Sequence, residues 1–235
     1  MNNKSPLTLL TLFAVAMAFL ESAVVVYMRQ LYYPGNPLEI FPLQFLNSYD
    51  TLLELGREAA TVMMILTVAM LAERSARTRT FAAFVFLFGV WDLFYYFWLK
   101  VLMGWPQSWL EWDVLFLIPS VWLGPWICPA LISLLFIVWG FWALRSAETI
   151  AFTPPSFMVF VAGAILGIAA FLQPAVSALI RGGMDELSRY TPGNFWWWLF
   201  VPSYLMMACG LGLTVCGVPA SFPATSAVPV QPRCD

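Results

Sequence analysis

The chain has 235 residues, of which 61% are hydrophobic and 10% are charged, and its formal net charge is −2. A soluble domain carries about 25% charged residues, so we expect an all-α polytopic integral membrane protein rather than a water-soluble fold. The absence of histidine excludes His-ligated haem, common zinc sites and Ser-His or Cys-His catalysis, and nothing in the charge balance indicates nucleic-acid binding.

Six segments are long and apolar enough to be transmembrane helices, which need about 20 mostly apolar residues. They are residues 6–28, 51–72, 80–101, about 125–145, about 156–173 and about 195–216. We therefore expect one six-helix domain over residues 1–216. The first segment has an alternative interpretation as a signal peptide, with Lys4 before it and small residues near a cleavage site, but its apolar run is long for that role.

Two segments outside these helices have unusual compositions. The loop at 103–126 is rich in Trp and Pro, and its run "DVLFLIP" is apolar but too short to span. Indole rings favour the headgroup level, so we expect this loop to be interfacial or re-entrant. The tail at 217–235 combines four prolines with small residues, and we expect it to be disordered.

Loop charge predicts the orientation of the helices. Arg74, Arg77 and Arg79 lie in or beside the short link between the second and third predicted helices. Positive residues in short loops favour the cytoplasm, so this link is predicted to be cytoplasmic. With six helices, both termini then also face the cytoplasm, and the Trp- and Pro-rich loop faces outward.

An acidic residue interrupts the third predicted helix. Asp92 lies within "FGVWDLFYYFWLK", residues 88–100. An ionised carboxylate at bilayer depth costs at least about 2.5–3.5 kcal/mol, so such a group faces the protein interior or water. Helical spacing places Asp92, Tyr96 and Lys100 on one stripe of the helix. We expect Lys100 to reach the headgroups from the helix end.

Other charged residues occur at a similar depth in the first two predicted helices. Glu21 lies in the first, and Arg57 and Glu58 lie in the second. Together with Asp92 and Tyr96, they predict an outward-facing polar pocket that binds a small molecule or an ion. We expect an Arg57 nitrogen within about 4 Å of a carboxylate from Glu21, Glu58 or Asp92. The alternative is an ionic clamp that only holds the three helices together.

The last two predicted helices carry weaker signals. Small residues at helical spacing predict ordinary packing faces; these are Gly163 and Gly167 in the fifth helix and Ala208, Gly212 and Cys216 in the sixth. Soft ligands for Cu(I) are also present in the sixth helix, namely Met206, Met207, Cys209 and Cys216. Their spacing does not place them on one face, so no metal site is predicted.

Three runs, at 19–35, 56–74 and 88–119, resemble a family of bacterial multi-pass membrane proteins to which no activity is assigned. The resemblance covers roughly the first 130 residues. It implies a bacterial inner (plasma) membrane location, but it identifies neither a cofactor nor a role for any residue.

Three functions stay open on the sequence. The first is small-molecule or ion binding or transport by the pocket. The second is an enzyme acting on a lipid or isoprenoid, with carboxylates such as Glu58 and Asp92 as acid and base. The third is a non-catalytic subunit or assembly factor. The expected partners are accordingly membrane lipids together with a small-molecule ligand or a membrane partner protein.

Overall fold

The computed structural model describes residues 6–44, 47–116, 120–146 and 150–216. These ranges contain six helices: α1 (Pro6–Tyr32), α2 (Ser48–Ala72), α3 (Arg77–Met103), α4 (Ile127–Arg145), α5 (Pro154–Ser188) and α6 (Trp197–Gly212). The first five are long and apolar enough to cross a membrane. The predicted disordered tail at 217–235 lies outside the described residues.

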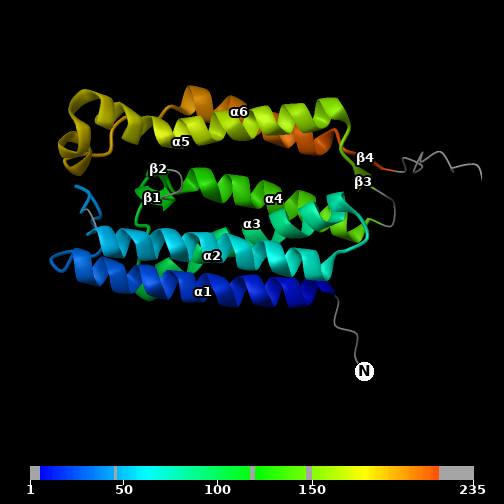
Figure 1. The fold of residues 1–235 in the computed structure, drawn as a ribbon, viewed down its shortest axis with the longest axis horizontal. Helices are drawn as coiled ribbons and strands as arrows, with labels where there is room; N and C mark the ends of the chain where they lie inside the picture. Colours follow the sequence, from blue (N-terminus) through cyan, green and yellow to red (C-terminus); the bar gives the residue numbers. More distant parts are fainter. Residues whose placement is uncertain (1–5, 45–46, 117–119, 147–149, 217–235) are drawn as a thin grey trace, which may run out of the picture.

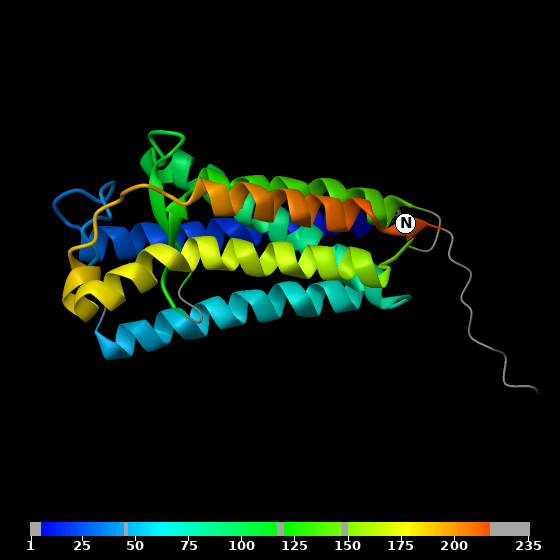
Figure 2. The ribbon, with the colours of Figure 1, turned by 90° about the horizontal axis from the view of Figure 1, so that it is seen from above.

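The helices run side by side along the long axis of the molecule (Figure 1). α3 is central and packs against α1, α2 and α4, whereas α5 and α6 form a second group. The start of α1 and the residues that follow α6 lie at the same end of the bundle (Figure 2). An even number of helices that alternate in direction gives this arrangement.

The sixth helix is shorter than predicted. α6 has 16 residues and ends at Gly212, below the roughly 20 residues that cross a bilayer unaided. The expected final residues of this helix instead form a short strand, β4 (Val215–Cys216), which pairs with β3 (Ile150–Ala151). α5 is longer than predicted, and its helical geometry is interrupted at Gly182 and Gly183.

Close backbone contact joins α5 to α6. A Cβ added at Gly163 would lie 2.7 Å from the Met207 nitrogen, and one at Gly210 would lie 2.5 Å from the Phe160 nitrogen. Glycine at both positions therefore lets the two helices approach closely. The packing face of α6 includes Gly210 and not the expected Gly212, beside which a Cβ would meet nothing within 4 Å.

The Trp- and Pro-rich loop folds into an antiparallel hairpin of β1 (Trp112–Phe116) and β2 (Trp122–Pro125). The hairpin lies between the α1–α4 group and the α5–α6 pair, and β2 contacts α5 (Figure 1). Trp105 and Trp112 are buried, whereas Trp109 is exposed. Trp105 and Trp112 therefore pack against protein, and of these three rings only Trp109 is exposed enough for the interfacial role expected of the loop.

Candidate functional site

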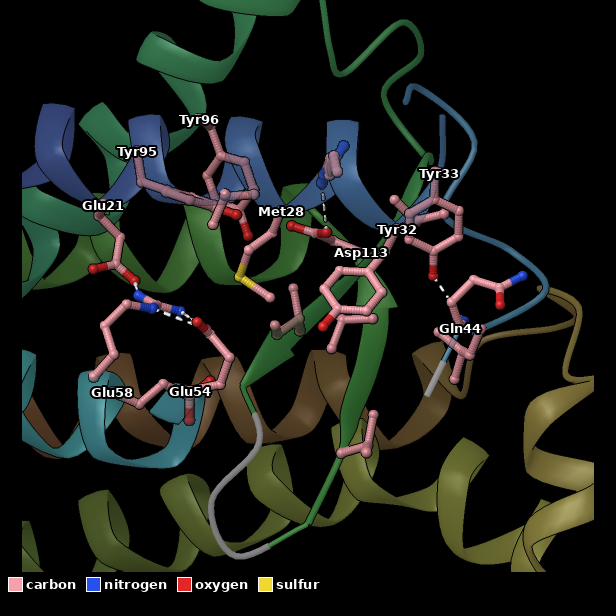
Figure 3. Close-up of a pocket in the computed structure, with 18 of the residues that line it drawn as sticks. Glu21, Met28, Tyr32, Tyr33, Gln44, Glu54, Glu58, Tyr95, Tyr96 and Asp113 are labelled. Carbon is pink, nitrogen blue, oxygen red and sulfur yellow. Dashed lines mark hydrogen bonds and ion pairs between the residues drawn. The ribbon is translucent and has the colours of Figure 1, made fainter. Parts of the chain in front are cut away.

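A cavity of about 260 Å³ lies where α1, α2 and α3 meet the hairpin. All five residues of the predicted pocket line it: Glu21 from α1, Arg57 and Glu58 from α2, and Asp92 and Tyr96 from α3. Figure 3 shows the side chains of α1, α2 and α3 converging on the space beside β1. The five predicted residues thus border one cavity, and their role stays a prediction.

Arg57 links α1 to α2 at one side of this cavity. Its guanidinium forms an ion pair with Glu21 and a second with Glu54, the latter at 2.6 Å between Nη2 and Oε2. The Thr61 hydroxyl also donates to Glu21, at 3.3 Å. The expected contact between Arg57 and a carboxylate is thus present. Glu54, which we had not included in the pocket, is part of the same network because it lies one turn before Arg57.

Asp92 does not share this network. The Ser133 hydroxyl of α4 donates to its Oδ2 at 2.7 Å, so its hydrogen-bond partner comes from α4 and not from α1 or α2. Tyr96, one turn further along, is buried. Lys100, which helical spacing places on one stripe with Asp92 and Tyr96, does not point with them. Its Nζ donates to the carbonyl oxygens of Gly104 and Pro106 at 3.0 and 2.7 Å. It closes the end of α3 and does not line the cavity.

A second ion pair, between Arg29 and Asp113, was not anticipated. Arg29 Nη2 lies 3.0 Å from Asp113 Oδ1, and the two side chains are only 5% and 3% exposed. The Arg29 guanidinium also lies 4.1 Å above the Trp105 ring, an attractive cation–π arrangement. The two residues are 84 positions apart, and only the unexpected hairpin brings Asp113 onto the end of α1.

The carboxyl group of Asp113 is in an unusual electrostatic environment. Burial raises its pKa to about 6, although the neighbouring Arg29 acts in the opposite direction. Its Oδ2 has no hydrogen-bond partner within the described part of the chain, and neither do Arg29 Nη1 and Trp91 Nε1. All three side chains line the cavity. Buried polar atoms are nearly always paired, so these atoms indicate a missing partner.

Aromatic and apolar groups complete the walls. Trp91, Tyr95 and Tyr96 contribute rings from α3, and Met28 projects from α1 between the Glu21 side and the Asp113 side (Figure 3). The cavity reaches the surface near Gln44, which is exposed and also lines it. There, the Tyr33 hydroxyl accepts from the Gln44 backbone nitrogen at 2.9 Å.

No group of three or more His, Cys, Asp or Glu side chains in the described ranges is arranged to hold a metal ion. The soft side chains of α6 also diverge: Met207 is buried and Cys209 is exposed. The arrangement can instead present carboxylates and aromatic faces to an organic molecule.

No known family model matches the chain, and no curated protein or solved structure is significantly similar to it. The resemblance to bacterial multi-pass membrane proteins therefore stays a prediction. The function must be inferred from the geometry of the cavity.

Proposed function

We propose that this chain is an integral protein of a bacterial inner membrane and that its cavity binds a small molecule from the outer side. The observation that carries the proposal is a cavity of about 260 Å³ lined by charged residues from three helices and a hairpin. Buried polar atoms without partners lie in its wall. A ligand that donates a hydrogen bond would supply a partner for one of them, the Asp113 Oδ2.

The rival interpretation is an ionic clamp. Arg57 does connect α1 and α2, and Arg29 connects α1 to the hairpin. The Arg57 network does not extend to Asp92, which accepts a hydrogen bond from Ser133 on α4 and still lines the cavity. Measured interhelical polar contacts contribute only about 0.6 kcal/mol on average, less than the cost of placing a charge in the membrane. Ligand binding therefore explains the charged residues of the cavity wall better than a clamp does.

The experiment compares the wild-type protein with a variant whose cavity is filled. Val114 lines the cavity, and Val114→Phe places a ring in that space. The matched control is Leu205→Phe, because Leu205 is exposed on α6 and does not line the cavity. Each purified protein is titrated by calorimetry with 2-phenylethylammonium, 2-phenylethanol and 3-phenylpropionate, which differ mainly in charge.

We expect at least one of the three compounds to bind the wild type and the Leu205→Phe control, and to bind the Val114→Phe variant at least tenfold more weakly. If none binds the wild type, or if the filled variant binds equally well, the cavity is not a small-molecule site.

A further inference from the structure

We propose that the ligand of this cavity is a small organic cation: a protonated amine with an apolar body. This inference rests on the proposed function and names its ligand class. Three independent features support it, namely the balance of charge in the wall, one buried oxygen without a partner, and the placement of the aromatic rings.

The wall of the cavity contains more acidic groups than basic ones. Its basic side chains are Arg29 and Arg57, and its acidic side chains are Glu21, Glu54, Glu58, Asp92 and Asp113. Arg57 contacts two of the carboxylates and Arg29 a third. A site with this imbalance attracts a positive charge, because unbalanced like charges are costly away from bulk water.

Asp113 limits which chemical group of a ligand can bind beside it. Its side chain is 3% exposed, one oxygen binds Arg29, and the other oxygen has no partner among the described residues. Figure 3 shows this carboxyl group projecting from β1 into the space that Met28 and Tyr32 also border. A carboxylate oxygen accepts hydrogen bonds, so the matching ligand group is an N–H donor rather than a quaternary ammonium.

Aromatic rings stand beside the same space. Tyr95 and Tyr96 are in ring contact at 5.0 Å between centroids, and both line the cavity with Trp91. A cation over such faces is attracted to them electrostatically, and the attraction is stronger when the site is desolvated. Val25 and Val114 also contribute to the wall. They suit an apolar body, whereas a small hydrated metal ion would gain nothing from them.

The test uses the full chain in detergent or lipid nanodiscs and needs no variant for its first part. Calorimetric affinities are measured for 2-phenylethylammonium, the neutral 2-phenylethanol, the anionic 3-phenylpropionate and the quaternary trimethyl(2-phenylethyl)ammonium. We expect the primary ammonium to bind at least tenfold more tightly than each of the other three.

Equal or tighter binding of the alcohol or the carboxylate overturns the cation inference and leaves a small-molecule site in place. Equal binding of the quaternary compound overturns the role of Asp113 as an acceptor. Binding of none of the four overturns the proposed function itself.

The second part of the test identifies the acidic side chains that recognise the positive charge of the ligand. Asp113→Asn and Asp92→Asn each remove one acidic group from the wall, and Glu186→Gln removes an exposed one on α5, where the Glu186 side chain is 49% exposed. We expect each of the first two to reduce the preference for the ammonium over the alcohol at least fivefold, and the control to leave it unchanged. If Asp113→Asn does not fold, Asp92→Asn and the wild-type selectivity still decide the outcome. An unchanged preference in both folded cavity variants overturns the inference.

Discussion

Arg29 and Asp113 are the most deeply buried ion pair described in the molecule, and each depends on the other for compensation of its charge. A buried pair of this kind adds little net stability compared with apolar residues, but the loss of one partner leaves an uncompensated charge. The pair should therefore be tested by removing its members singly and together.

We predict that Asp113→Leu or Arg29→Met alone destabilises the protein by about 3–5 kcal/mol, as measured for other broken buried pairs. The double variant should recover most of that loss, because it leaves neither charge behind. Thermal unfolding of the four detergent-solubilised proteins gives the comparison. Additive losses in the double variant would show that the two side chains do not compensate each other.

Asp113 also predicts a pH dependence of stability. Its pKa is raised from 3.8 to about 6 by burial, so the protonated form favours the folded state. Its contribution to stability is fully present below about pH 3.8 and is lost as the pH rises through about 6. Arg29 from α1 and Glu111 before β1 act on the same carboxyl group, and it interacts electrostatically with Asp92, Tyr95 and Tyr96 from α3.

We therefore expect the melting temperature of the wild type, minus that of Asp113→Asn, to fall between pH 4 and pH 6 and to level off above pH 7. The measurement is thermal unfolding of both ligand-free proteins across this range. A difference that grows as the pH rises would contradict the assigned direction.

At the level of single residues, sequence reasoning found the charged residues that interrupt apolar helices, because the cost of a buried charge is visible in composition alone. Glu21, Arg57 and Asp92 were found in this way. Asp113 and Arg29 were not, since an aspartate in a loop and an arginine at a helix end carry no such penalty until the hairpin buries them.

At the level of elements, the α5–α6 contact depends on the absence of side chains at the crossing. Gly210→Ala would place a Cβ 2.5 Å from the Phe160 backbone nitrogen, whereas Gly212→Ala meets nothing within 4 Å. Gly210 and Gly212 are two residues apart in α6. The same substitution is therefore tested in two different surroundings.

We predict that Gly210→Ala lowers the free energy of unfolding by about 1–3 kcal/mol through overpacking. Gly212→Ala should be neutral or slightly stabilising, because alanine has the higher helix propensity by up to about 1 kcal/mol. Thermal unfolding of both variants checks this. Equal effects at the two positions would argue against close packing at Gly210.

Hydropathy located the five long apolar helices, because a window of about 20 apolar residues selects helices of membrane-crossing length. It failed at two places for physical reasons. The last residues of the predicted sixth helix are apolar, but Val215 and Cys216 form β4 and pair with β3 instead. The 103–126 loop forms its hairpin through β1–β2 pairing and contacts with α5, and such long-range contacts have no periodic signature in a short Trp-rich segment.

At the level of the whole molecule, the orientation in the membrane is the main prediction. α3 runs from Arg77 to Met103, so a reporter fused after Arg79 and one fused near Gln107 flank a single pass. The positive-inside rule predicts cytoplasmic activity for the first fusion and external activity for the second. The reverse result would place the cavity on the cytoplasmic side, and its ligand would then come from the cytoplasm.

The described residues that line the cavity fall between positions 21 and 121, and α5 and α6 supply none of them. The two parts of the molecule meet where β2 packs on α5 and where α4 contacts α6. Residues 150–216 therefore affect the cavity only through packing and supply no described part of its wall. Sequence drift or engineering within residues 150–216 can change the packing of the protein while every described residue that lines the cavity is inherited unchanged.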